Sequence, residues 1–167
     1  MLFGETRFWM GISDMRFLKR IRKYLLEHAA LNLQIDMKRL PGFVRIKVKA
    51  AAICATDLEV LDGNIAANYP LTPGHEWSGI VDAVGSEEDA HWIGKRVIGS
   101  SDVACLTCEA CRSGNWRYCK DFEEIGFKRN GAYAEYAIMP AYGLVELPDN
   151  VSFAQGALCE PLGVALG

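Results

Sequence analysis

Hydrophobic and polar side chains alternate strictly from residue 44 to residue 49. Apolar Val44, Ile46 and Val48 are separated by basic Arg45, Lys47 and Lys49. A period of two is typical of a β-strand with one face buried and the other face in water. We therefore predict a strand here, with its apolar side turned towards the core of the protein.

Four further segments have a strand-like composition and are separated by glycine and proline. They cover residues 79–84, 95–98, 133–139 and 144–147. Glycine and proline interrupt both helices and strands, so they set the boundaries of short elements. Short helices are expected after Cys54 and from about Phe153. This pattern predicts a mainly β protein with short helices (α+β), folded as a small, partly closed β-barrel.

Residues 1–31 have a different pattern, in which apolar positions recur at helical spacing among basic side chains. The apolar positions are Phe17, Ile21, Tyr24, Leu25, His28 and Leu31. We interpret this segment as a packed helix or an N-terminal extension; the alternative is a basic amphipathic helix that binds a membrane or a partner. Leu31, Leu33 and Ile35 are compatible with one more strand within 31–38. We therefore place the main domain at 32–155, followed by a connecting segment at 156–167.

Composition narrows the functional classes. The chain has 167 residues, of which 50% are hydrophobic, and a net charge of −3, so it can bury a core but has no basic stripe for nucleic-acid phosphates. No apolar run reaches the roughly 18 residues that a membrane-spanning helix needs. Six cysteines without a secretory signal pattern indicate a reducing compartment. We expect a soluble, cytoplasmic protein that binds neither nucleic acid nor a membrane.

Four of the six cysteines lie in one short stretch. Cys105, Cys108, Cys111 and Cys119 have the spacing C-x₂-C-x₂-C-x₇-C. Zn²⁺ accepts four thiolates at about 2.3 Å, and such a closed site leaves no position for a substrate. Disulfides between cysteines this close fit the required geometry poorly, and the ferredoxin motif has its fourth cysteine after x₃ and before proline. The stretch therefore predicts a lobe built around a structural zinc ion.

A second group of metal-ligating residue types is spread over two loops. Cys54 follows the strand predicted from Val44, and His75 and Glu76 lie in a turn before the predicted strand 79–84. A cysteine, a histidine and a carboxylate suit an open zinc site, where the ion acts as a Lewis acid on water or substrate. The same residue types are also common in cores and turns, so both interpretations remain open from these residues alone.

The order of the motifs resembles that of the zinc-dependent medium-chain alcohol and polyol dehydrogenases, with sorbitol- and threonine-type members most similar. The motifs are Cys-x-Thr-Asp at 54–57, Gly-His-Glu at 74–76, the four-cysteine stretch and Cys-Glu-Pro-Leu at 159–162. The resemblance extends over residues 41–167. It implies a GroES-like catalytic domain in which Cys54 and His75 hold a catalytic zinc, in addition to the structural zinc.

The resemblance also implies roles for residues around that catalytic zinc. Glu76 matches a glutamate that ligates the ion in some members and lies behind it in others, and Glu160 matches a ligand position that is cysteine in alcohol-type members. Thr56 matches a hydroxyl that relays the substrate proton, and Asp57 matches a carboxylate that orients the zinc-bound histidine. Cys159 is one residue away from the matching position, and we expect it to be a buried thiol.

The chain departs from the family pattern at both ends. The family begins with a pair of strands that leads into the strand at Val44, and residues 1–30 do not resemble such a pair, which would leave an exposed sheet edge. No G-x-G-x-x-G follows a strand in these 167 residues. We therefore expect this chain to lack the Rossmann domain, to need it for NAD(P) binding, and to be inactive alone.

The resemblance implies oxidation of a small-molecule alcohol, polyol or hydroxy-amino acid by hydride transfer to NAD(P). Glutamate at position 160 favours polyol- and threonine-type substrates, and an oligomer is possible for the full-length protein. The alternative function is a truncated, non-enzymatic zinc-binding module. A zinc ribbon that binds nucleic acid fits poorly, because the paired C-x₂-C…C-x₂-C spacing is absent.

Overall fold

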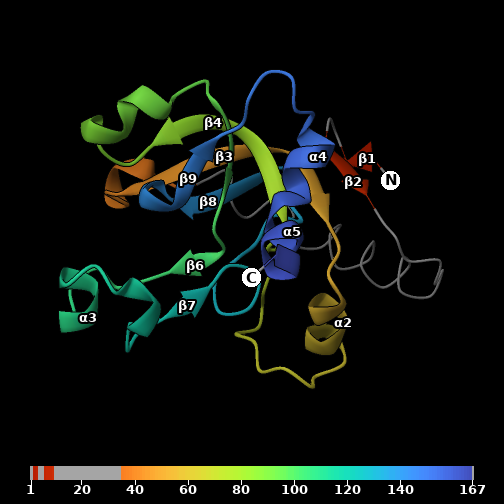
Figure 1. Cartoon of the computed structure of the whole chain (residues 1–167), viewed down its shortest axis with the longest axis horizontal. Helices are drawn as coiled ribbons and strands as arrows, with labels where there is room; N and C mark the ends of the chain where they lie inside the picture. Colours follow the sequence, from red (N-terminus) through yellow and green to blue (C-terminus); the bar gives the residue numbers. More distant parts are fainter. Residues whose placement is uncertain (1, 4–5, 10–34, 167) are drawn as a thin grey trace.

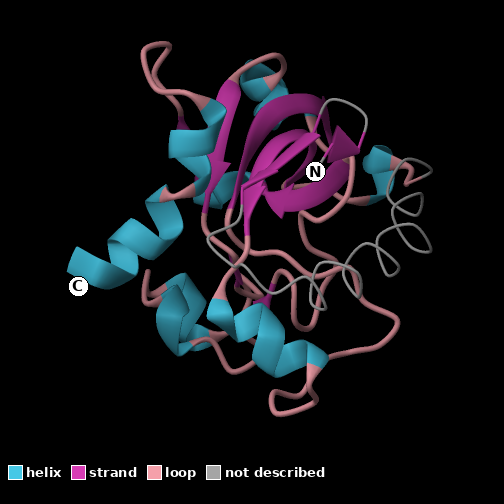
Figure 2. Cartoon of the chain, turned by 90° about the vertical axis from the view of Figure 1, so that its right-hand side faces the viewer, coloured by secondary structure: helices cyan, strands magenta, loops and turns pink. Residues whose placement is uncertain are grey.

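The body of the protein is a curved sheet of seven strands, and a smaller two-stranded sheet carries a separate lobe (Figure 1). The computed structural model describes residues 2–3, 6–9 and 35–166. Paired strands follow the order β1–β2–β3–β4–β5–β9, and β8 also pairs with β3. The strands curl around one another in the orthogonal view (Figure 2). The prediction of a mainly β fold with short helices is confirmed.

The strands are two to ten residues long, and the helices are three to eight residues long. The strands of the body are β1 (Leu2–Phe3), β2 (Thr6–Trp9), β3 (Phe43–Ala52), β4 (Trp77–Val84), β5 (Arg96–Gly99), β8 (Tyr136–Pro140) and β9 (Leu144–Glu146). The lobe contains β6 (Asp102–Val103), β7 (Glu123–Glu124), α3 (Glu109–Arg112) and η3 (Trp116–Tyr118). The other helices are η1 (Met37–Arg39), α2 (Ala55–Leu61), η2 (Glu87–Trp92), η4 (Ala141–Gly143), α4 (Phe153–Ala157) and α5 (Cys159–Leu166).

β3 is the central strand, and its alternating pattern is confirmed. Val44, Ile46 and Val48 are at most 1% exposed, whereas the basic residues between them are half-buried. β4 and β8 run antiparallel to β3 on its two sides. Burying each of these aliphatic side chains contributes about 1.5–3 kcal/mol. The strand therefore anchors the core and presents its end, at Ala52, to the candidate site.

β8 begins three residues later than the pattern predicts. The residues before it bond to the turn at 72–74 instead of extending the strand: Gly131 N donates to Thr72 O at 2.6 Å, Ala132 N to Gly74 O at 2.8 Å, and Tyr133 N to Pro73 O at 3.0 Å. These bonds fasten the turn that precedes His75. The difference from the prediction therefore has a direct bearing on the candidate site.

The N-terminal part of the sheet differs from the sequence-based expectation. β1 and β2 form an antiparallel pair, and β2 pairs in parallel with the end of β3, so residues 2–9 contain a strand pair that the pattern did not reveal. Strands of two and four residues show too few alternations to be recognised. The strand expected within 31–38 is wrong for Met37 and Lys38, which lie in η1 (Met37–Arg39), and residues 31–34 lie outside the described part of the chain. The helix proposed within residues 1–31 lies outside the described residues.

Two helices follow the sheet towards the C-terminal end. Ser152 caps α4 by accepting from Gln155 N, and Gln155 Oε1 accepts in return from Ser152 N. The guanidinium of Arg96 stacks on the Phe153 ring at 4.6 Å and donates to Val151 O, which ties this region to β5. α5 then projects away from the sheet (Figure 2). Among the described residues, no helix is long and apolar enough to cross a membrane.

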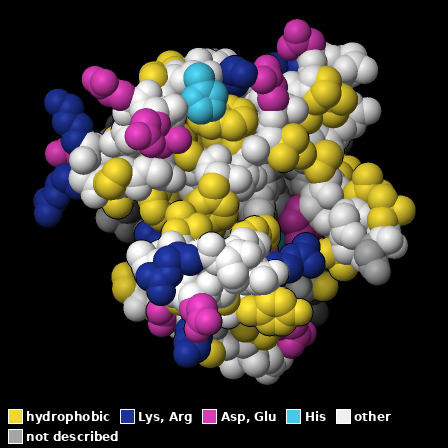
Figure 3. All heavy atoms as spheres, turned by 60° about the vertical axis from the view of Figure 1, so that its left-hand side comes forward, with side chains coloured by type: hydrophobic (Ala, Val, Ile, Leu, Met, Phe, Trp, Pro, Cys, Tyr) yellow, Lys and Arg dark blue, Asp and Glu magenta, His cyan; other side chains and the backbone are white. Residues whose placement is uncertain are grey.

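A hollow separates the sheet from the lobe in the space-filling view, and hydrophobic side chains border it (Figure 3). A cavity of about 380 Å³ is lined by side chains that include Trp92, Leu106, Tyr142 and Leu144. Tyr142 also bridges the two parts, because its hydroxyl accepts from Ala104 N at 2.8 Å and donates to Asp102 O at 3.1 Å. The lobe is thereby attached to the body beside the pair β6–β7.

Candidate functional site

The lobe brings its four cysteines to one point. One ligand atom from each of Cys105, Cys108, Cys111 and Cys119 lies within 4.8 Å of the others. The sulfurs of Cys105 and Cys111 are 3.9 Å apart, close to the edge of about 3.8 Å expected for four sulfurs at about 2.3 Å from a shared ion. All six cysteines are free thiols.

Backbone donors already point at these sulfurs. Cys105 Sγ accepts from Cys108 N and Cys119 Sγ accepts from Cys105 N, both at 3.3 Å. Hydrogen bonds from Thr107 and from the backbone lower the pKa of Cys105 to about 6, whereas burial raises the pKa of Cys111 to about 12. Clustered thiolates repel one another, and a shared cation compensates that repulsion. The donor set fits a closed zinc site.

The second group begins where β3 passes into α2. Cys54 is the residue before the first turn of α2, and its backbone N–H donates to Asp57 Oδ2 at 2.9 Å. A short acceptor three residues into a helix satisfies an amide at the helix start that would otherwise lack a partner. The local sequence Cys-Ala-Thr-Asp thus ends the strand, starts the helix and turns Cys54 towards the turn that carries His75.

His75 and Glu76 approach Cys54 from the turn before β4. One ligand atom each from Cys54, His75 and Glu76 lies within 4.8 Å of the others, as expected for ligands of one ion. His75 is 6% exposed and Glu76 is 4% exposed. The ring of His75 packs against Phe127 at 5.0 Å between centroids. The three side chains therefore form a compact group, in which His75 and Glu76 are buried and Cys54 is half-buried.

Asp57 lies behind His75 and is almost fully buried, at 1% exposed. Its Oδ1 lies 3.4 Å from His75 Nδ1, yet neither atom has a hydrogen-bond partner in the described part of the chain. Buried polar atoms without partners destabilise a fold, so two of them facing each other call for a functional explanation. A neutral imidazole that turns Nδ1–H towards Asp57 leaves Nε2 with a lone pair for a metal ion. The orphaned atoms fit a zinc-bound histidine.

Neighbouring charges change the acid–base behaviour of this group. Burial, the largest influence, lowers the pKa of His75, but Asp57 and Cys54 together outweigh it and raise the pKa to about 9. Burial also raises the pKa of Glu76; His75 opposes this shift and Glu160 adds to it. The acidic groups around His75 therefore favour a positive charge at this place. A divalent ion would supply positive charge there.

Two more of the expected residues lie at the border of the group. Thr56 Oγ1 is 3.2 Å from Cys54 Sγ, and its side chain is half-buried, so it reaches towards both the cysteine and solvent. Glu160 lies in the first turn of α5 and is near enough to raise the pKa of Glu76, but it is not in the compact three-residue group. The prediction of a buried thiol at Cys159 is wrong: the residue is half-buried, because α5 buries none of its residues, and its Sγ lies 3.8 Å from Gln155 O.

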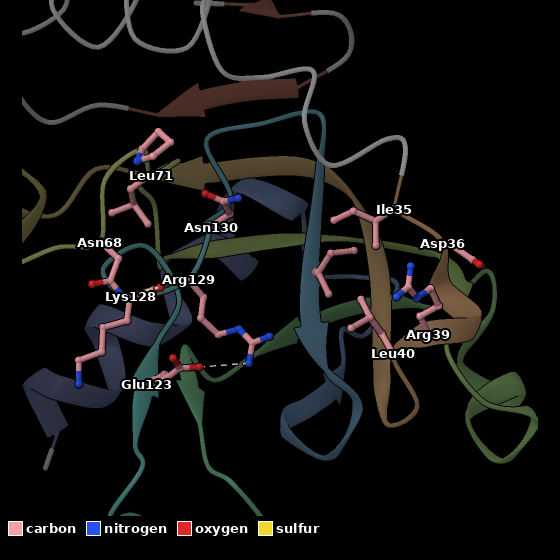
Figure 4. Close-up of a pocket in the computed structure, with 12 residues that line it drawn as sticks. Ile35, Asp36, Arg39, Leu40, Asn68, Leu71, Glu123, Lys128, Arg129 and Asn130 are labelled. Carbon is pink, nitrogen blue, oxygen red and sulfur yellow. Dashed lines mark hydrogen bonds and ion pairs between the residues drawn. The ribbon is translucent and has the colours of Figure 1, made fainter.

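A separate cavity of about 900 Å³ lies between η1 and the loops at 68–71 and 123–130 (Figure 4). Basic and acidic side chains line it, and Arg129 pairs with Glu123 at 3.2 Å. Figure 4 shows Arg39 on the opposite side from Lys128, so these two cations do not converge. The cavity includes none of the metal-ligating residues. It is distinct from the candidate metal centre.

Sequence reasoning missed the part that Tyr133 plays. Its hydroxyl lies 2.5 Å from Asp57 Oδ2 and 2.8 Å from Ala52 O, and the residue is only 1% exposed. Burial and the Asp57 carboxylate raise the pKa of Tyr133 well above its usual value, so the hydroxyl keeps its proton. The sequence pattern predicted only that Tyr133 belongs to the strand at 133–139. No spacing rule signals a contact between residues so far apart in the chain.

Comparison with known proteins gives a consistent result. The family model described as "Alcohol dehydrogenase GroES-like domain" matches residues 40–149. An L-threonine 3-dehydrogenase of Edwardsiella ictaluri is 36% identical over 127 residues, which are 74% of this chain and 37% of that protein. The chain therefore spans little more than a third of the length of the curated relatives that it matches.

Solved structures support the same relationship. A zinc-binding dehydrogenase from Sinorhizobium meliloti, bound to NADP, matches with a TM-score of 0.68 and 36% identity over 75% of this chain and 37% of that one. Galactitol-1-phosphate dehydrogenase from Escherichia coli matches with a TM-score of 0.65 and 33% identity over 75% of this chain and 36% of that one. The chain belongs to the zinc-dependent medium-chain alcohol dehydrogenase family, and its described core is the GroES-like domain of that family.

Proposed function

We propose that this chain forms the zinc-binding catalytic part of an NAD(P)-dependent dehydrogenase that oxidises an alcohol, a polyol or a hydroxy-amino acid. The observation that carries the proposal is the compact group of Cys54, His75 and Glu76, with Asp57 behind the histidine. A cysteine, a histidine and a carboxylate with room for a further ligand are typical of a catalytic zinc site. A purely structural site would be closed, as the lobe is.

In this proposal Cys54 Sγ and His75 Nε2 hold the zinc ion, and Glu76 and Glu160 supply carboxylates around it. When bound, the zinc acts as a Lewis acid that favours the alkoxide form of the substrate alcohol. Asp57 keeps the imidazole of His75 in the tautomer that leaves Nε2 free. Burial and, to a lesser degree, the charge of Glu160 raise the pKa of Glu76, and a cation beside the two carboxylates relieves their repulsion.

Thr56 is the proposed proton relay. Its hydroxyl lies 3.2 Å from Cys54 Sγ and is half-buried, so it can contact both a group bound beside the cysteine and water outside. A hydroxyl can accept one proton while donating another, and therefore passes a proton outward without becoming charged. Removal of the hydroxyl as Thr56→Val would keep the side-chain shape and slow this transfer.

The hydride acceptor in this proposal is NAD or NADP, in line with the NADP bound to the Sinorhizobium protein. We propose that residues outside these 167 bind the nucleotide, since no G-x-G-x-x-G follows a strand here. The four-cysteine lobe holds the second, structural zinc. Six free thiols are in keeping with a cytoplasmic location. The L-threonine 3-dehydrogenases among the relatives make hydroxy-amino acids the first substrates to test.

Metal stoichiometry tests this proposal directly. The purified chain should bind two Zn²⁺ or Co²⁺ equivalents, and Cys54→Ser should remove one of them while circular dichroism stays unchanged. Added alcohols or hydroxy-amino acids should alter the Co²⁺ absorption of the wild type and leave that of Cys54→Ser unaltered, because only the Cys54 site has an open position. A chain that binds one metal ion, retained in Cys54→Ser, would instead be a zinc-binding module without a catalytic centre.

A further inference from the structure

Tyr133 links three separate parts of the candidate metal centre. Its hydroxyl has one proton and faces two acceptors, Asp57 Oδ2 at 2.5 Å and Ala52 O at 2.8 Å. Ala52 is the last residue of β3, and Asp57 lies in the first turn of α2. A hydrogen bond to a charged acceptor is shorter and stronger than one between neutral groups, so the carboxylate is the principal partner.

The hydrogen bonds of Asp57 determine which of its oxygens faces the histidine. Oδ2 accepts from both Cys54 N and the Tyr133 hydroxyl, whereas Oδ1 has no hydrogen-bond partner among the described residues and points to His75 Nδ1. Two donors on one oxygen hold the carboxylate plane in a single orientation. Without the hydroxyl, the buried carboxylate keeps one donor and can rotate about its last bond to seek a partner for the other oxygen.

The ring of Tyr133 supports the turn that carries His75. A Cβ placed on Gly74 would lie 2.4 Å from the Tyr133 ring, so the backbone of the turn rests directly on the aromatic face. Tyr133 N also donates to Pro73 O at 3.0 Å. The residue therefore contacts the histidine turn with its ring and backbone, and the Asp57 side chain with its hydroxyl. These two contacts can be separated by a substitution that removes only the oxygen.

We propose that Tyr133 is a positioning residue of the Cys54–His75 site, whose hydroxyl fixes the orientation of Asp57 and, through it, of His75. This inference rests on the proposed metal centre. It assigns to one hydroxyl a task that the ring alone does not perform, because the ring packs on Gly74 while the oxygen reaches Ala52 and Asp57. Loss of the hydroxyl should therefore weaken metal binding at this site without affecting the four-cysteine site.

Tyr133→Phe tests the proposal, since it preserves the ring and deletes the hydroxyl. Loss of an outer partner of a metal ligand typically lowers metal affinity 10–100-fold, so we expect about a 10-fold loss at the Cys54–His75 site. Competition with a zinc chelator measures this affinity, and the Co²⁺ absorption of the same site should shift. Tyr142→Phe is the matched control: it removes a tyrosine hydroxyl bonded near the lobe and should leave the Cys54–His75 affinity unchanged.

A double substitution separates a positioning role from general packing. If Tyr133 acts through the carboxylate of Asp57, Tyr133→Phe should have no further effect on metal affinity in an Asp57→Asn background. Equal effects in both backgrounds, or wild-type affinity and an unshifted Co²⁺ spectrum in Tyr133→Phe, would overturn the inference while the two-metal proposal stands. A wild-type chain that binds metal only at the lobe would overturn both.

Discussion

The two groups of metal-ligating residues are built in opposite ways. In the lobe, all four sulfurs come from one short stretch, and the backbone amides that point at them belong to the same stretch. In the Cys54–His75 site, the ligands come from two separate loops and are held by contacts to a third segment, at Tyr133. One site is local in sequence, and the other exists only when the sheet has formed.

The difference extends to burial. Three of the four lobe cysteines are half-buried, whereas in the other group only Cys54 is half-buried and His75 and Glu76 are at most 6% exposed. A site whose ligands come from one short stretch depends on its ion for most of its stability. A site braced by the fold can keep its arrangement through other contacts, such as those from Tyr133 to Asp57 and to the turn before His75. The comparison predicts that the two sites respond differently to substitution.

The largest effect is expected from Cys108→Ser, which removes one ligand of the lobe. Structural zinc contributes roughly 10–16 kcal/mol of apparent binding free energy in small zinc domains, and most of this would be lost locally. Amide hydrogen exchange should become fast between Cys105 and Cys119, while the amides of β3 and β4 remain protected. Metal analysis should show one ion fewer. Protection retained throughout the lobe would contradict a metal-dependent fold there.

A smaller effect is expected from Gly74→Ala, which tests how the turn before His75 packs against Tyr133 in the Cys54–His75 site. Gly74 has φ of 100°, and its added Cβ would meet the Tyr133 ring. Gly94→Ala is the matched control, because Gly94 has φ of 80° with open space around it. We expect Gly74→Ala to lower the free energy of unfolding by about 1–3 kcal/mol more than the control does.

Denaturant titration of both variants in the zinc-loaded state measures this difference. Gly74→Ala should also weaken metal binding at the Cys54–His75 site, because the turn must move away from Tyr133, whereas Gly94→Ala should not. Equal unfolding free energies in the two variants would mean that the Tyr133 ring can move away from the added methyl group without loss of stability. The turn at His75 would then depend on its backbone hydrogen bonds rather than on packing against Tyr133.

The same contrast explains what could be predicted from the sequence. The lobe was recognisable because cysteine spacing alone brings its sulfurs together. β3 was recognisable because its apolar and polar residues alternate over enough positions to show a period of two. Cys54 and His75 were recognised only from the order of several motifs. The support from Tyr133 was not predictable, since it depends on residues 131–133 bonding to the turn at 72–74 instead of joining β8.

Short elements set the other limit. β1 and β2 are too brief to show a period, so their pairing beside β3 appears only in the folded chain. The position of Glu160 is a similar case: the sequence relates it to a ligand position, but its distance from Cys54 and His75 depends on how α4 and α5 continue from the sheet. Packing of neighbouring elements decides such placements, and local pattern does not contain that information.

The smallest effect is expected from Cys159→Ser, which completes the set of cysteine-to-serine changes. Cys159 lies beside Glu160 at the start of α5, outside both metal-ligating groups, and its thiol contacts only Gln155 O among the described residues. The free energy of unfolding should change by no more than about 0.5 kcal/mol, and both metal ions should remain. If Cys159→Ser instead loses one ion, Cys159 is a metal ligand in place of Glu160, and the start of α5 belongs to the metal centre. If Cys159→Ser keeps both metal ions and Cys54→Ser loses one, Cys54, between β3 and α2, is the cysteine ligand of that site.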